Sequence, residues 1–160
     1  MRTRAATPDD AAAIATIYNE GIADRIATFE TEPRTADEVR RWFTSTHPIV
    51  VIEDDNGAVI AFASTSVYRP RQCYSGVAEF SVYVARAARG RGAGRTAMNA
   101  LMDAARDKGF RKLVSRVFVE NEASRSLLRA VGFREVGTYR KHGCLDGEWH
   151  DTVIVERLLE

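Results

Sequence analysis

The feature that most constrains the fold is a glycine- and arginine-rich segment, Arg86 to Arg95, between a β-type run and a helical run. The β-type run is Val77 to Val84, and the helical run has an apolar face formed by Ala97, Met98, Leu101 and Ala105. The segment itself contains four arginines, three glycines and no acidic residue. Glycine lets a backbone approach a ligand closely, and free N–H groups at a helix start bind anions. The pattern therefore predicts a phosphate-binding loop, with a solvated loop that only caps the helix as the alternative.

Two other phosphate-binding motifs fit this segment less well. A Walker loop is excluded because Gly94-Arg95-Thr96 lacks the lysine that this motif requires. Gly92 to Ala97 matches the G-x-G-x-x-A fingerprint of dinucleotide-binding domains, and Glu120 follows at about the distance that this fingerprint needs. The loop from Val84 to Gly92 is longer than the tight turn of that motif, however, and the preceding strands look antiparallel. A dinucleotide site is therefore disfavoured.

Hydrophobic periodicity along the chain predicts an α/β domain with a mixed central sheet. Thr7 and Thr35 are expected to begin two N-terminal helices, because acidic residues and then apolar residues at helical spacing follow each of them. A third helix is expected between Gly90 and Gly109, and a fourth over Ser124 to Val131. The expected strands are Ile49 to Glu53, Ala58 to Val67, Val77 to Val84, Lys112 to Val119, Phe133 to Arg140 and His150 to Leu158, with Arg2 to Ala6 as a candidate opening strand. The sheet should be antiparallel in its N-terminal part, with crossover helices in its C-terminal part.

Length, charge and cysteine content limit the class of protein. A chain of 160 residues predicts a single domain over residues 1–160. With 23 basic and 22 acidic residues the net charge is +1, so nothing suggests a nucleic-acid or membrane partner. Cys73 and Cys144 lack metal-type spacing, and no uncharged apolar run approaches the ~20 residues of a membrane span. We therefore expect a cytoplasmic protein without a metal site.

Two motifs together resemble those of the GNAT superfamily of N-acetyltransferases. Arg89-x-x-Gly92-x-Gly94 is similar to the loop that holds the pyrophosphate of acetyl-CoA, and Asn121 to Ser124, followed by Gly132-Phe133, is similar to the second motif. Further segments resemble the phosphinothricin, arsinothricin and methionine-sulfone N-acetyltransferases, with the arsinothricin type most similar: Tyr18-Asn19, Thr28 to Pro33, Ala78 to Val84 and Trp149-His150-Asp151. The resemblance covers nearly the whole chain and implies the GNAT fold.

The same resemblance implies acetyl-CoA as cosubstrate and a set of residues that hold it. The glycine-rich loop would bind the pyrophosphate, the strand before it would align the thioester, and the second motif would contact the pantetheine side. The implied residues are Val82, Tyr83, Val84, Arg89, Gly90, Arg91, Gly92, Ala93, Gly94, Arg95, Thr96, Asn121 and Ser124.

Acetyl transfer to an amine requires a base, and Glu79 is the candidate. Strand alternation places Glu79 on one face with Val77, Ser81 and Tyr83, and a carboxylate there can take the amine proton directly or through a water. The matching glutamate is the proposed base in the resembled enzymes; the alternative is a solvent-facing sheet carboxylate. Where many superfamily members carry a tyrosine as general acid, this chain has Leu128. Tyr83 and Tyr139 are weaker candidates for that acid, with packed aromatic rings as the alternative, and departure of the thiolate without an acid is also possible.

Five residues are candidates for substrate binding. Arg69, Arg71 and Tyr74 occupy the turn before the Glu79 strand, where arginines would pair with carboxylate, phosphinate or arsinate oxygens. Alignment favours Arg69 for some of the resembled enzymes and Arg71 for others. Phe29 matches an aromatic residue that lines the amino-acid pocket, and His150 matches a histidine of the phosphinothricin enzymes. Core packing is the alternative for Phe29, and a structural role in its strand is the alternative for His150.

The resulting hypothesis is an N-acetyltransferase that transfers the acetyl group of acetyl-CoA to the α-amino group of a small anionic amino-acid toxin. Arsinothricin, phosphinothricin, methionine sulfone and methionine sulfoximine are the candidate acceptors, and a homodimer is expected. One alternative is a regulatory module that binds acetyl-CoA without catalysis, which the absent tyrosine favours and the presence of Glu79 disfavours. Another is transfer to a different amine, such as a protein N-terminus, a lysine or an aminoglycoside.

Overall fold

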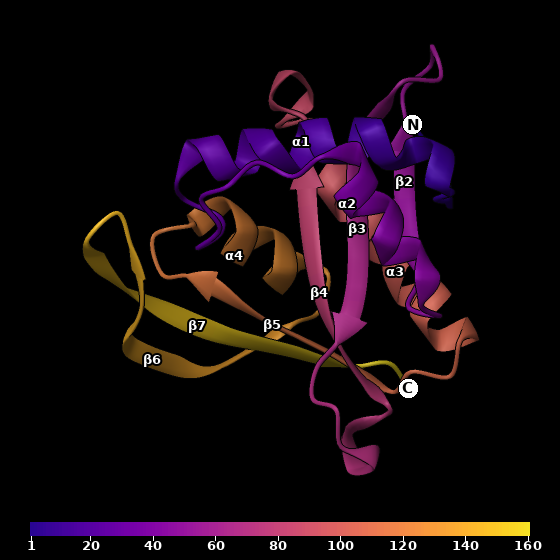
Figure 1. Cartoon of the computed structure of the whole chain (residues 1–160). Coiled ribbons are helices and arrows are strands. Elements are labelled where there is room, and N and C mark those ends of the chain that lie inside the picture. Colours follow the sequence, from indigo (N-terminus) through magenta and orange to yellow (C-terminus); the bar gives the residue numbers. More distant parts are fainter.

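A seven-stranded mixed sheet forms the centre of the computed structural model, which describes residues 1–160 (Figure 1). The strands lie in the order β1-β2-β3-β4-β5-β7-β6. Their bounds are Arg2–Ala5 for β1, Ile49–Glu53 for β2, Val59–Val67 for β3, Val77–Val84 for β4, Lys112–Phe118 for β5, Arg134–Leu145 for β6 and Glu148–Leu158 for β7. The pair β4–β5 is parallel and every other pair is antiparallel. This confirms the predicted mixed α/β sheet.

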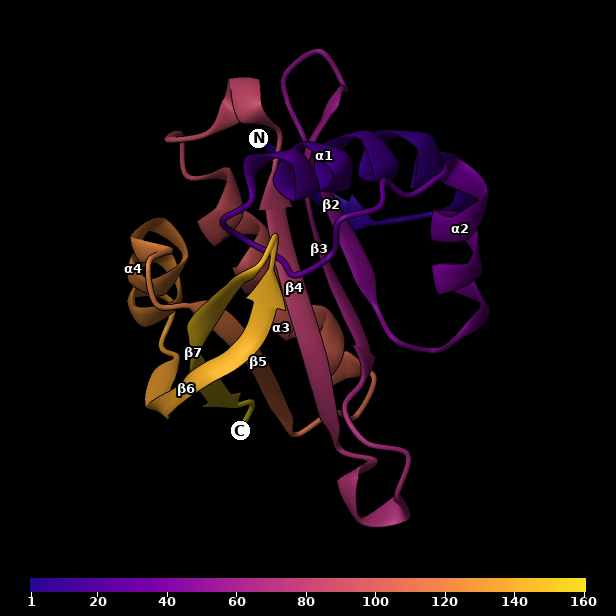
Figure 2. The ribbon, with the colours of Figure 1, turned by 60° about the vertical axis from the view of Figure 1, so that its left-hand side comes forward.

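Helices cover both faces of the sheet and produce two separate cores (Figure 2). The helices are α1 (Ala11–Asp24), α2 (Ala36–Arg40), α3 (Ala93–Asp107) and α4 (Glu122–Ala130), with single 3-10 turns over Pro8–Asp10, Arg41–Thr44, Gln72–Tyr74 and Arg86–Ala88. The helices α1 and α2 pack on one face, whereas α3 and α4 pack on the other. None of the helices has the length and apolar character needed to cross a membrane.

The observed elements differ from the predicted ones by more than two residues at two places. The α-helix near Thr7 starts only at Ala11, because Pro8–Asp10 forms a 3-10 turn first. The last two strands extend further into their connection than predicted, up to Leu145 and from Glu148. The polar residues before Leu145 look like a turn in the sequence, but they form a bulged hairpin in which Lys141 has φ 45° and its N–H donates to Asp151 Oδ1 at 2.7 Å.

The strands β4 and β5 pair over only three residues before they diverge. Their register joins Val77 to Lys112, Ala78 to Leu113 and Glu79 to Val114, and no later backbone pair follows. Beyond this point the Ser115 hydroxyl donates to the Phe80 carbonyl at 3.0 Å. The carboxyl-terminal half of β4 therefore presents backbone groups that no strand occupies on its β5 side, and the two strands open into a wedge (Figure 1).

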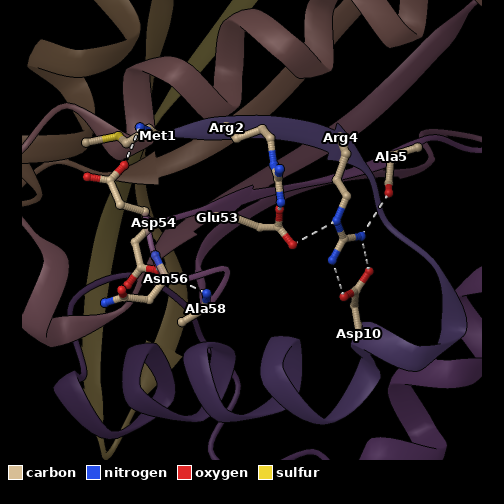
Figure 3. Close-up of polar contacts among 10 residues, drawn as sticks. Met1, Arg2, Arg4, Ala5, Asp10, Glu53, Asp54, Asn56 and Ala58 are labelled. Carbon is tan, nitrogen blue, oxygen red and sulfur yellow. Dashed lines mark hydrogen bonds and ion pairs between the residues drawn. The ribbon is translucent and has the colours of Figure 1, made fainter.

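A cluster of ion pairs ties the N-terminal strand to its neighbours (Figure 3). Glu53 on β2 accepts from Arg2 at 2.6 Å and from Arg4 at 3.1 Å. The Arg4 guanidinium also donates twice to Asp10 at 2.8 Å, and Asp10 in turn accepts from the Thr7 backbone N–H at 2.8 Å. These contacts anchor β1 and orient the start of α1.

The same cluster predicts loss of stability in acid. Hydrogen bonds from Arg4 lower the pKa of Asp10, and those from Arg2 and Arg4 lower the pKa of Glu53. Because both carboxyls have lower pKa values when folded, their stabilisation is present above their unfolded pKa values and is lost as the pH falls through the folded ones. We expect Asp10→Asn to lower the Tm at pH 7 by about 2–4 °C and to make the Tm decline between about pH 5 and pH 3 shallower. Calorimetry at a series of pH values tests this, with Asp55→Asn, a substitution of an exposed aspartate, as control. Parallel curves of Tm against pH for wild type and Asp10→Asn would contradict the prediction.

Candidate active site

The wedge between β4 and β5 contains a cavity of about 70 Å³. Four residues expected to hold acetyl-CoA line it together: Val82, Tyr83, Asn121 and Ser124. The Asn121 side chain also accepts from the Ser124 N–H at 3.2 Å and thereby caps α4. A narrow channel beside an unpaired strand edge suits an extended chain that carries its own amide groups.

The glycine-rich loop stands at the open end of β4 and leads into α3. Gly90 and Gly92 have φ values of 80° and 84°, which only glycine adopts without strain. The backbone conformation of the loop therefore explains why glycine occupies these two positions. Gly92 is the N-cap residue of α3, whose first N–H groups lack partners within the helix. The loop arginines are exposed, and Arg89 pairs with Asp24 of α1 at 2.8 Å. Exposed cations around a helix N-terminus fit a pyrophosphate.

A larger cavity of about 320 Å³ adjoins the wedge and contains Glu79. The two cavities share six lining residues, namely Ala27, Phe80, Ser81, Tyr83, Ser115 and Arg116. The alternation predicted for β4 is observed, because Ala78 and Phe80 are buried against α3 whereas Glu79 and Ser81 face this cavity. The base candidate therefore lies where the wedge meets the larger cavity.

Glu79 belongs to a chain of polar contacts that links three strands. Its Oε1 atom accepts from Arg116 Nη2 on β5 at 3.2 Å, and the Glu79 side chain is 31% exposed. Arg116 Nη1 lies 3.4 Å from His142 Nε2 on β6, and the His142 ring stacks on Tyr139 with centroids 4.4 Å apart. Neither Arg116 nor His142 was expected at the site from the sequence. The one available signal was that Arg116 is a charged residue in the interior of a β-type run.

Phe29 forms a wall of the Glu79 cavity, whereas His150 lies behind that wall. The Phe29 ring packs against Phe118 with centroids 4.6 Å apart, and against the backbone of Gly143. A Cβ atom on Gly143 would clash with this ring, so the close approach requires glycine. The His150 ring stacks on Phe118 at 4.9 Å, and its Nδ1 atom lies 3.5 Å from Glu120 Oε1. His150 therefore supports the aromatic wall and does not line the cavity.

Arg69, Arg71 and Tyr74 do not reach the Glu79 cavity within one chain. The strands β3 and β4 stay paired as far as Val67 and Ala78, so their hairpin continues outward and carries the turn away from the sheet (Figures 1 and 2). None of the three residues lines the wedge, the Glu79 cavity or the third cavity, which lies between the first two helices and β3. Within a single chain these three residues therefore do not reach the rim of the Glu79 cavity, contrary to the expectation. Their contact with substrate stays a prediction.

A third cavity, of about 390 Å³, lies between the first two helices and β3. It shares Tyr18, Ser66, Ser81 and Tyr83 with the Glu79 cavity. Its cationic residues are Arg34, which pairs with Glu30 at 2.8 Å, and Arg41, which has no ion pair. His47 also lines it, and burial lowers the pKa of this imidazole. Neither arginine was a candidate site residue from the sequence.

Comparison with known proteins identifies the class. Residues 14–133 match the acetyltransferase (GNAT) family, so the chain belongs to that family. It is 32% identical to phosphinothricin N-acetyltransferase of Streptomyces coelicolor, covering 99% of this chain and 96% of the relative. It is 31% identical to an L-methionine sulfoximine/L-methionine sulfone acetyltransferase of Pseudomonas aeruginosa, covering 94% and 90%. A Sinorhizobium meliloti phosphinothricin acetyltransferase, solved in complex with acetyl-CoA, superposes with a TM-score of 0.91 at 32% identity, covering 98% and 87%.

The GNAT fold, the acetyltransferase class and acetyl-CoA as cosubstrate are thereby confirmed. The structure contains no cluster of three or more histidine, cysteine or acidic side chains arranged to hold a metal ion.

Proposed function

We propose that this chain acetylates the α-amino group of a small anionic amino acid, with phosphinothricin, arsinothricin, methionine sulfone and methionine sulfoximine as candidate acceptors. The observation that carries the proposal is the position of Glu79 at the junction of the β4–β5 wedge and a cavity large enough for an amino acid. The names of the relatives from Streptomyces and Pseudomonas point to the same acceptor class.

In the proposed reaction Glu79 acts as general base. Acetyl-CoA supplies the acetyl group as a thioester, the α3 N-terminus holds its pyrophosphate, and the unpaired edge of β4 aligns its thioester carbonyl. Glu79 takes a proton from the substrate ammonium, and the amine nitrogen bonds to the acetyl carbon. The carbon–sulfur bond then breaks, the nitrogen gives up its second proton, and the departing thiolate takes up this proton directly or through water.

The structure offers no tyrosine acid at the usual position. Leu128 lines the end of the wedge and is 2% exposed. Burial raises the pKa of Tyr83, whose ring stacks on Tyr18 with centroids 5.0 Å apart, which supports a packing role for Tyr83. Because a free thiol has a pKa near 8.5, the proposed mechanism lets the thiolate leave without a dedicated acid.

The acceptor class is tested by thiol release from acetyl-CoA in the presence of a small panel. The panel contains phosphinothricin, arsinothricin, methionine sulfone, methionine sulfoximine, glutamate and an aminoglycoside. We expect rapid release with at least one of the first four compounds and its N-acetyl product by mass spectrometry. Acetyl-CoA binding without transfer to any compound would instead favour a non-catalytic module, and transfer to the aminoglycoside alone would identify a different acceptor.

We also propose that the enzyme works as a cytoplasmic homodimer. The support is apolar surface on the outward hairpin turn, where Val67 is 56% and Tyr74 is 37% exposed. A second copy that covered this turn would bury both side chains. Light scattering coupled to size-exclusion chromatography should give twice the chain mass, and a single-chain mass at micromolar concentration would reject the dimer.

A further inference from the structure

Arg116 is placed to serve more than one partner. Its guanidinium donates to Glu79 at 3.2 Å and lies 3.4 Å from His142, and no other protein atom accepts from it. A guanidinium carries five N–H donors, so most of them are free. Arg116 also lines both the wedge and the Glu79 cavity. Free donors at this junction can take an anionic group of a molecule bound beside Glu79.

The pairing between Arg116 and Glu79 is one that a ligand can replace. The two side chains are 42% and 31% exposed and share a single hydrogen bond, so solvent screens their attraction. A carboxylate that engaged two N–H groups of Arg116 would form the stronger bidentate pair. Such a ligand would draw the guanidinium from Glu79 and leave that carboxylate free to accept a proton.

The geometry of an α-amino acid determines which of its anionic groups would bind Arg116. In an α-amino acid the ammonium and the carboxylate are joined through one carbon atom. An ammonium that contacts Glu79 therefore brings its own α-carboxylate next to Arg116, whose Nη2 atom already contacts the same Glu79 oxygen. An anionic group at the far end of the acceptor's own side chain would lie further from Glu79. It could extend past Ser81, which lines both the Glu79 cavity and the cavity that contains Arg41.

His142 is placed to hold Arg116 in this position. A guanidinium only donates, so the Nε2 atom of His142 accepts in this contact when the imidazole carries its hydrogen on Nδ1. Stacking on Tyr139, with ring planes 21° apart, orients the imidazole. His142 lines the same cavity from β6, so the guanidinium is held from both sides.

We propose that Arg116, positioned by His142, binds the α-carboxylate of the acceptor amino acid and releases Glu79 to act as base when it does so. The inference rests on the proposed function, since it requires an α-amino acid acceptor and Glu79 as base. It makes Arg116 a residue that selects α-amino acids over other amines, and His142 a positioning residue.

The test compares methionine sulfone with its α-carboxamide as acceptors, by kcat/KM. Wild type should prefer the free acid, and Arg116→Gln should reduce that preference by about 10- to 100-fold. Because amidation also changes the amine pKa, the readout is the change in preference between variant and wild type. Arg140→Gln, which removes an exposed arginine from β6 that has no ion pair, is the matched control and should keep the preference. Acetyl-CoA affinity and Tm confirm that each variant is folded.

His142 is tested by two substitutions. His142→Leu removes the acceptor for Arg116 and should raise the KM for methionine sulfone by about 3- to 10-fold with a smaller change in kcat. His142→Gln retains a carbonyl acceptor and should restore most of the affinity. A leucine variant that behaves like wild type, or a glutamine variant as impaired as leucine, would overturn the positioning role.

The outcomes separate this inference from the proposed function. If wild type acetylates neither compound nor any other α-amino acid, the proposed function fails, and this inference fails with it. If wild type is active and its preference for the free acid survives Arg116→Gln, only this inference fails. Loss of the preference in Arg41→Gln instead would place the carboxylate in the neighbouring cavity and overturn the role of Arg116.

Discussion

Replacing Glu79 by glutamine is expected to lower kcat at neutral pH by about 10²- to 10⁴-fold, while the affinity for acetyl-CoA stays within about 2-fold of wild type. Glutamine has nearly the same shape as glutamate but cannot take the ammonium proton, so the loss falls on the chemical step. The Glu79 carboxylate lies in the Glu79 cavity and contacts only Arg116, so the wedge keeps its lining. Steady-state kinetics, with acetyl-CoA binding measured by calorimetry, checks both quantities.

The matched control for this experiment is Glu120→Gln. The carboxylate of Glu120 lies 3.5 Å from His150, outside the Glu79 cavity, and its loss should leave kcat nearly unchanged. If Glu79→Gln weakened acetyl-CoA binding and kcat to the same extent, Glu79 would be a structural residue, and the general base would have to be sought elsewhere.

The second large effect is expected for Gly92→Ala in the loop before α3. Gly92 has φ 84°, where a residue with a Cβ atom is strained by roughly 1–2 kcal/mol. A strained loop no longer presents the α3 N–H groups in their binding arrangement. We therefore expect about 5- to 30-fold weaker acetyl-CoA binding, measured by calorimetry, with kcat at saturating acetyl-CoA much less affected.

Gly57→Ala provides a control matched in backbone geometry. Gly57 has φ 81°, and at Gly57, as at Gly92, an added Cβ would meet no atom within 4 Å. Its turn joins β2 to β3, away from the wedge. Both variants should lose similar stability, and only Gly92→Ala should lose acetyl-CoA affinity. Equal affinity losses in the two variants would show that a general loss of stability, and not the loop, sets the effect.

The parts of the fold that follow local rules could be predicted from the sequence. The β4 strand has its predicted bounds because apolar and polar residues alternate over Val77–Val84, and α3 follows the glycine-rich segment as its periodicity indicates. The β6–β7 hairpin was predicted too short. Its bulge near Lys141 is stabilised by a contact with Asp151 across the hairpin, which no local pattern encodes.

The candidate site divides in the same way. By itself the sequence determined the loop that precedes α3, since positive φ values require glycine there, and it determined the cavity face of β4 that carries Glu79. Only the tertiary structure decided which side chains meet Glu79. Arg116 reaches Glu79 because β4 and β5 pair in one register and then diverge, and His142 on β6 reaches Arg116 in turn. The arginines before β4 are kept out because the β3–β4 pairing carries their turn outward. Strand register and divergence arise from contacts between residues far apart in the chain, which local periodicity does not contain.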